Sequence, residues 1–146
     1  ITISDEDIMY MALYGTGQIA EFDIRKRQMI AIHDLPDTGA APYAATWDPV
    51  RRVVWVATSN ADVIYRFDPA TRQFGVLPLP RERGFLRMID IDPATGVLVT
   101  SYANIVENVN GPRMVLIVEP GDGAYPSTFT PSRAVAPAPA RQGGGF

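Results

Sequence analysis

The sequence contains no cysteine and only one histidine, His33. Without cysteine the chain has no disulfide, no thiolate nucleophile, no cysteine-bound zinc and no covalently attached haem. A lone histidine has no second histidine or cysteine with which to share a transition metal. The sequence therefore predicts no metal site and no cofactor.

Positive charge and long hydrophobic runs are also scarce. The net charge of -3 argues against a nucleic-acid partner, because phosphate binding needs a cationic surface. The longest apolar runs, such as Ile8–Tyr14 and Val53–Ala57, are far shorter than the roughly 20 residues that cross a bilayer. We therefore expect no transmembrane segment, and any membrane association would run through a partner.

What the sequence does contain is an internal repeat. One unit reads Val53–Ala57, five loop residues and Val63–Asp68, and its pattern stands 45 positions earlier at Ile8–Ala12. It returns 44 positions later, where Asp92–Val99 matches Asp48–Trp55. Such a period predicts stacked structural units. Their expected bounds are about 1–42, 43–85 and 86–129, with an insertion near 105–112 in the third.

Each unit is predicted to hold four short antiparallel strands. Stretches of β-branched and aromatic residues alternate with turn formers, and no helical periodicity is sustained. The turn Asp92–Gly96 combines an Asx acceptor, a proline and a glycine for positive φ. Four-stranded units at this period are typical of β-propeller blades. We predict an all-β fold of about three blades, belonging to a six- or seven-bladed propeller. The strands expected in the best-formed unit are Tyr43–Trp47, Val53–Thr58, Val63–Asp68 and Phe74–Leu79.

Four segments of the middle unit carry a family resemblance: Pro42–Ala45, Val54–Thr58, Ala61–Thr71 and Leu77–Pro80. They resemble the repeat of the virginiamycin B lyase-like propellers, or streptogramin lyases, which are related in style to NHL-repeat propellers. The resemblance implies a seven-bladed propeller that opens a cyclic depsipeptide by elimination across its ester. It also implies a magnesium ion held with histidine and glutamate side chains on one rim.

The positions that the resemblance assigns to catalysis hold other residues in this chain. The lyases commonly carry histidine after the proline that opens a blade, where this chain has Tyr43 and Arg87. They often carry glutamate after the tryptophan strand, where this chain has Leu13, Thr58 and Tyr102. Without imidazole or carboxylate, these positions supply neither a general base nor ligands for a hard cation. We therefore name no catalytic residue.

Consecutive antiparallel strands place their turns alternately on two rims. The Asp-Pro hairpins share one rim, and the longer, more varied loops share the other, where binding groups concentrate. His33 and Asp34 on this second rim allow either an acid–base pair or a solvated histidine on an edge strand. The candidate ligand or partner residues are His33, Asp34, Tyr43, Asn60, Asp62, Arg83, Arg87, Tyr102, Glu107, Asn110 and Arg113. The residues expected in the core between blades are Tyr10, Trp47, Trp55 and Phe67.

The segment 130–146 is rich in proline and glycine and has no acidic residue. Such a segment has no core of its own, so it is expected to extend along the propeller wall or a partner chain. Arg133, Arg141 and Phe146 are its candidate partner contacts. Three blades also leave two blade faces open, which further blades of the same propeller or another protein chain would cover.

Two functions follow as hypotheses. The first is a non-catalytic binding or scaffolding propeller subunit of a larger periplasmic or extracellular assembly. The alternative is a lyase-like or lactonase-like propeller enzyme whose catalytic residues lie mainly in blades other than these three.

Overall fold

The structure is a computed structural model that describes residues 1–80, 84–104, 114–121 and 133–134. Within these residues the chain forms antiparallel strands and turns and no helix, so no helix there could span a membrane. The all-β prediction is confirmed. The four strands predicted for the middle unit also agree with the observed ones to within one residue at each end.

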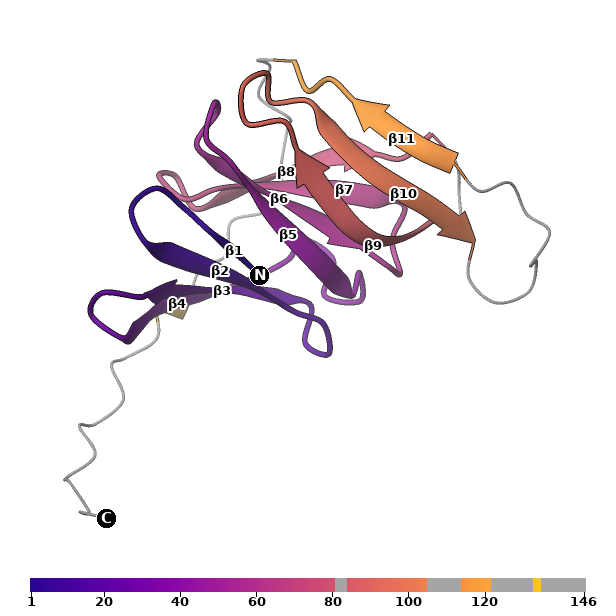
Figure 1. Cartoon of the computed structure of the whole chain (residues 1–146). Helices are drawn as coiled ribbons and strands as arrows, with labels where there is room; N and C mark the ends of the chain where they lie inside the picture. The colour runs from indigo at the N-terminus through magenta and orange to yellow at the C-terminus, as the bar shows by residue number, and fades with distance from the viewer. Residues whose placement is uncertain (81–83, 105–113, 122–132, 135–146) are drawn as a thin grey trace, which may run out of the picture.

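Three antiparallel sheets follow one another along the chain (Figure 1). In each sheet, strands that are consecutive in sequence lie side by side, because short hairpins connect them. The first sheet holds β1 (Thr2–Ile3), β2 (Ile8–Leu13), β3 (Gln18–Asp23) and β4 (Gln28–Asp34). The middle sheet holds β5 (Pro42–Asp48), β6 (Val53–Thr58), β7 (Val63–Asp68) and β8 (Gln73–Pro78). The third sheet holds β9 (Gly84–Ile91), β10 (Leu98–Asn104) and β11 (Met114–Val118).

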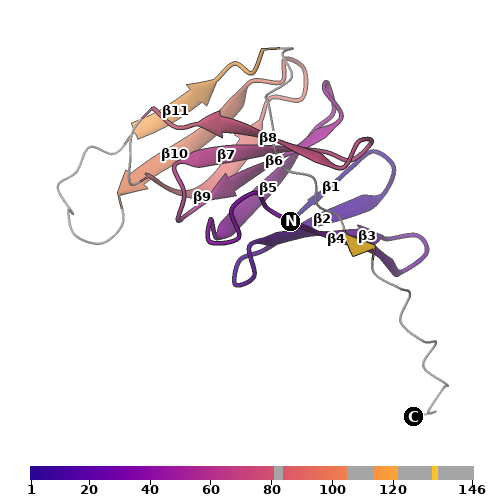
Figure 2. The same cartoon turned by 180° about the vertical axis from the view of Figure 1, so that it is seen from behind.

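Two described residues of the C-terminal segment return to the first sheet. They form β12 (Arg133–Ala134), which pairs with β4 so that Arg133 lies opposite Ile32 (Figure 2). The tail therefore touches the chain's own first sheet at this point. The rest of the tail, and the stretch where a fourth strand of the third sheet would fall, lie outside the described residues.

The repeat is visible in the backbone of the turns as well as in the sequence. Asp7, Arg52 and Gly96 adopt positive φ values of 60°, 56° and 71° at successive spacings of 45 and 44 residues. Arg27 and Arg72, also 45 residues apart, have φ values of 53° and 58°. Positive φ is uncommon for residues other than glycine. Equivalent hairpins in different sheets thus share a positive φ at the same position, and the positive φ predicted at Gly96 is confirmed.

The core lies between the sheets, and β6 at the centre contributes to both halves of it. All six β6 side chains are buried, and successive ones point to opposite faces of the sheet. Val54 and Val56 pack in the cluster shared with the first sheet, whereas Val53, Trp55 and Ala57 pack in the cluster shared with the third. Burial on both faces explains why β6 lacks the polar alternation of a surface strand. The four predicted core aromatics, Tyr10, Trp47, Trp55 and Phe67, are at most 8% exposed.

Candidate functional site

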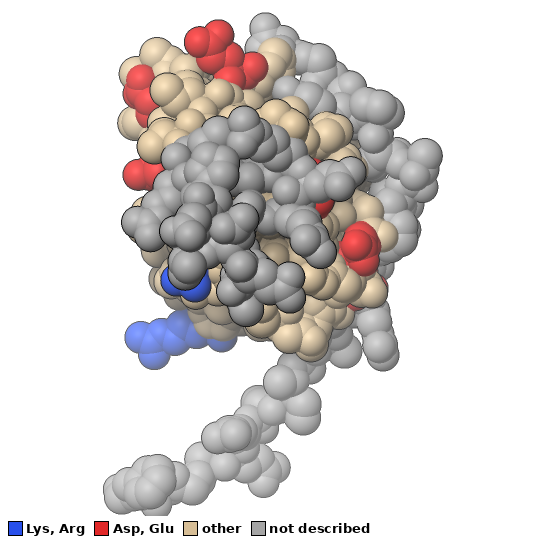
Figure 3. All heavy atoms as spheres, turned by 90° about the vertical axis from the view of Figure 1, so that its right-hand side faces the viewer, with Lys and Arg blue, Asp and Glu red and all other residues tan. Residues whose placement is uncertain are grey.

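One end of the stack of sheets gathers the turns β2–β3 and β6–β7 and the segments that enter β5 and β9. This end, here called the loop rim, is the one on which the sequence predicts binding residues. Figure 3 views the molecule from this side. Most of the described surface there is uncharged; acidic side chains are scattered near its edges, and basic side chains lie at the lower left of the view.

A row of aromatic side chains crosses the loop rim from sheet to sheet. The rings of Tyr14 and Tyr43 meet edge to face at 5.8 Å between centroids, and those of Tyr43 and Phe85 at 5.7 Å. The Arg87 guanidinium lies over the Phe85 ring, 4.9 Å from its centroid. Tyr14 is 54% exposed and Tyr43 47%. We call Tyr14, Tyr43, Phe85 and Arg87 the aromatic row; the first, middle and third sheets all contribute to it.

Backbone geometry directs Tyr43 outward. The pairing of β5 with β6 is irregular between Pro42 and Ala44, so Tyr43 falls out of the regular ladder. Bulges of this kind redirect a side chain. Ala41, just before the irregularity, has a positive φ of 52°, and its carbonyl accepts the backbone N–H of Ser59 at 3.0 Å. The local structure of the middle sheet therefore fixes where the Tyr43 ring lies.

Two further predicted rim residues support this arrangement without joining the row. The Asn60 amide donates to the carbonyl of Gly39 at 2.9 Å, which ties the β6–β7 turn to the segment leading into β5. The Asp62 carboxylate accepts the backbone N–H of Gly84 at 2.7 Å, which fixes the start of β9 beside Phe85. Asn60 and Asp62 are thus positioning residues for the row.

The expectation for His33 is wrong in both of its forms. Its side chain is fully buried, so it is not a solvated histidine, although β4 is the outer of the four consecutive strands of the first sheet. Asp34 follows it on the strand and therefore points to the opposite face, where its carboxylate accepts from the Gln18 amide at 2.6 Å. The sequence predicts that His33 ends an outer strand, Met29–His33, and only the packing of the middle sheet shows what covers its side chain.

His33 instead belongs to a buried polar group between the first and middle sheets. Its ring packs against Phe67 at 4.6 Å between centroids, and its Nε2 atom lies 3.4 Å from Glu21 Oε2 without hydrogen-bond geometry. Burial, and secondarily the Glu21 charge, raise the pKa of the neighbouring Tyr10. Because the imidazole is inaccessible, a substrate on the surface cannot reach it.

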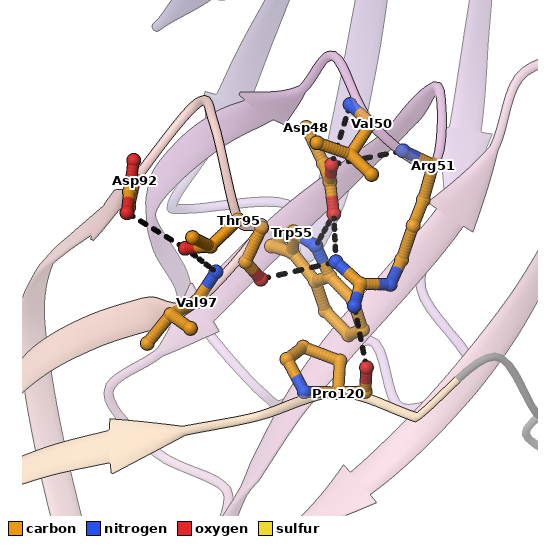
Figure 4. Close-up of polar contacts among 9 residues, drawn as sticks. Asp48, Val50, Arg51, Trp55, Asp92, Thr95, Val97 and Pro120 are labelled. Carbon is orange, nitrogen blue, oxygen red and sulfur yellow. Dashed lines mark hydrogen bonds and ion pairs between the residues drawn. The ribbon is translucent and has the colours of Figure 1, made fainter.

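A buried polar cluster lies on the opposite rim, between the middle and third sheets (Figure 4). The Asp48 carboxylate is fully buried and accepts from Trp55 Nε1 at 3.0 Å and from Arg51 Nη1 at 3.1 Å. Arg51 also donates to the carbonyls of Gly96 at 3.0 Å and Pro120 at 2.6 Å, both from the third unit. Its partners are backbone carbonyls and a buried carboxylate, so the cluster serves as a latch between the two sheets.

The structure thus brings together two predicted residues, Tyr43 and Arg87, through Phe85. Phe85 and Tyr14 were not predicted as site residues; the signal available in the sequence was an aromatic side chain beside a loop on the predicted rim in each unit. Tyr102 lies within β10. The predicted residues outside the described part of the chain are Arg83, Glu107, Asn110, Arg113, Arg141 and Phe146.

Among the described residues, no group of three or more histidine, cysteine, aspartate or glutamate side chains could hold a metal ion. Comparisons with protein-family models, with curated proteins and with solved structures gave no match to this chain.

Proposed function

We propose that the three sheets are blades of a β-propeller whose repeat is of the virginiamycin B lyase-like type, without the seven-blade count of that family. Three observations support this architecture. Equivalent turns recur at 44 to 45 residues with the same positive φ, and each sheet is built from consecutive antiparallel strands. The sheets also pack face to face through two apolar clusters, as neighbouring blades of a propeller do.

On this scaffold we propose a non-catalytic binding or scaffolding function in a periplasmic or extracellular assembly, with the aromatic row as the binding surface. The observation that carries the proposal is the exposure of Tyr14 and Tyr43 at about half of their surface in a row fixed to three sheets. Tyrosine and arginine are enriched among the residues that dominate protein–protein binding energy. The row therefore suits a protein partner that offers apolar side chains to the rings and a carboxylate to Arg87.

The alternative of a lyase-like enzyme finds no support in the described residues of the aromatic row. The phenols, the phenyl ring and the guanidinium of the row are not bases near neutral pH. The only imidazole of the chain is buried between two sheets. A catalytic role would therefore need groups other than those of the aromatic row, whereas a binding role needs only the row itself.

A photo-crosslinking experiment tests the binding role. The photoreactive amino acid p-benzoylphenylalanine is placed at position 43, and as a control at position 50, where Val50 is 53% exposed on the opposite rim. In an extract of the producing cells we expect a discrete adduct from position 43 and none from position 50. Unlabelled wild-type chain competes the adduct away, whereas the Tyr43→Ala variant competes about 30-fold less well, because truncating such an anchor costs about 2 kcal/mol or more. Equal adducts from the two positions, or equal competition by the two chains, would contradict the proposal.

A further inference from the structure

The first and third sheets form the two ends of the stack (Figure 1). Each of them has an outer face that carries apolar side chains. On the third sheet, Met88, Val99, Val115 and Ile117 are 66%, 41%, 70% and 65% exposed. Val99 lies directly opposite Ile117 in the β10–β11 ladder, so these side chains adjoin one another. We call Met88, Val99, Val115 and Ile117 the third-sheet outer face. Asp90 and Ser101 are exposed polar residues beside it.

The first sheet has a matching face on its far side. Ile3 lies opposite Met9 in the β1–β2 ladder, and Met9 lies opposite Phe22 in the β2–β3 ladder, so the three share one face. Ile3 is 50% exposed, and Met9 and Phe22 are half-buried. Met11, two residues along β2 from Met9, points the same way. Ile3, Met9, Met11 and Phe22 are the first-sheet outer face.

The repeat shows what the third-sheet outer face corresponds to. Val99 stands 44 residues after Trp55, which is buried in the middle sheet against the third. Val115 lies opposite Ser101 just as the buried Ile64 lies opposite Ala57. The third-sheet outer face is therefore the counterpart of the middle-sheet face that the third sheet covers.

The first-sheet outer face corresponds to the other half of the same interface. Met9 stands 45 residues before Val54, and Phe22 stands 45 residues before Phe67. Val54 and Phe67 are fully buried in the middle sheet against the first sheet. The two free faces of the chain are thus the two complementary sides of one sheet–sheet interface, which occurs twice inside the molecule.

We propose that the third-sheet outer face of one copy of this chain packs on the first-sheet outer face of a second copy, and that the reverse contact closes a ring of six sheets. The inference rests on the proposed propeller architecture but not on the aromatic row. Each copy supplies both halves of the interface, and six lies within the four to eight blades with which propellers close. A contact between two different faces must either close into a ring or extend into an open filament. A propeller is by definition a closed arrangement of blades, so a ring of six sheets, and not a filament, is the form expected here.

Sedimentation equilibrium of the 146-residue chain gives the first test, with an expected mass of twice 16.0 kDa. Val115→Asp and Ile3→Asp place one charge on each face. Both variants are expected to be folded, as measured by circular dichroism, and monomeric, as measured by sedimentation equilibrium. An equimolar mixture of the two variants is expected to form a dimer again, because one of its two contacts pairs intact faces. The control Val50→Asp, in an exposed turn, is expected to remain a dimer.

A monomeric wild-type chain, or an open series of larger assemblies, would overturn ring closure. A dimer that Val115→Asp disrupts but Ile3→Asp leaves intact would also overturn it, because that result indicates two identical faces in contact. Tyr43→Ala is expected to leave the dimer unchanged. Loss of crosslinking at position 43 and loss of dimerisation are therefore separate failures, the first of the binding role and the second of this inference.

Discussion

Replacing Arg51 by alanine tests how much the latch between the middle and third sheets contributes to stability. The side chain is 17% exposed and donates to three acceptors, the buried Asp48 carboxylate and the carbonyls of Gly96 and Pro120. Gly96 and Pro120 belong to the third unit, so the guanidinium joins parts of the chain that are 45 and 69 residues away.

The expected loss of unfolding free energy is about 3 kcal/mol. Breaking a buried ion pair costs about 3–5 kcal/mol when the remaining charge is left without partners. Here Asp48 retains three other donors, the backbone N–H groups of Val50 and Arg51 and the Trp55 indole. These donors place the cost at the lower end of that range.

The neighbouring Arg52 provides a matched control. Its side chain is 60% exposed and pairs with Glu6, which is 46% exposed, and surface pairs of this kind contribute about 0–1 kcal/mol. Urea unfolding followed by tryptophan fluorescence compares Arg51→Ala with Arg52→Ala. If the two variants lose the same stability, or if Arg51→Ala loses less than about 1 kcal/mol, the latch does not hold the sheets together.

Two further variants probe the backbone and the buried polar group. Gly17 has a φ of 64°, and an added Cβ would collide with the Thr38 carbonyl oxygen. A left-handed backbone conformation alone costs a residue with a side chain about 1–2 kcal/mol. Gly17→Ala is therefore expected to lower the unfolding free energy by more than this amount. Gly15 has open space around it, so Gly15→Ala is expected to leave the unfolding free energy unchanged or to raise it by up to about 1 kcal/mol. Similar losses of melting temperature in Gly17→Ala and Gly15→Ala would refute the role given to the Gly17 backbone. Burial and the Glu21 charge raise the pKa of Tyr10 above its ordinary 10.0, so its contribution to stability is present below pH 10.0 and is lost as the pH rises further. Tyr10→Phe is expected to flatten the alkaline decline of unfolding free energy, and an unchanged slope would show that Tyr10 does not cause it.

Local chemistry made the strands and turns of this chain predictable. The turn at Asp92–Gly96 needs an Asx acceptor and a residue tolerant of positive φ, and the sequence provides both; the structure confirms a φ of 71° at Gly96 and a hydrogen bond from Ala94 N–H to Asp92. The same holds for the strands of the middle sheet, whose β-branched residues lie between such turns. These features depend on residues a few positions apart.

The candidate site was predictable only in part. Tyr43 was predicted because it follows Pro42, at the position that the expected lyase-like repeat would assign to a catalytic histidine. Phe85 and Tyr14 were missed because their importance arises from contact between sheets, at ring distances of 5.7 and 5.8 Å. His33 was misplaced for a related reason, since its burial depends on Phe67 from another sheet.

By itself the sequence determined the β character, the period of 44 to 45 residues and the turn positions, because hydrogen bonding and φ preferences act over a few residues. Only the tertiary structure decided which faces are covered. Residues at equivalent positions of the repeat, such as Trp55 and Val99, have the same local surroundings, yet one is fully buried and the other 41% exposed. Burial depends on whether another sheet packs against the face, which is a property of the assembly of sheets and not of any one strand.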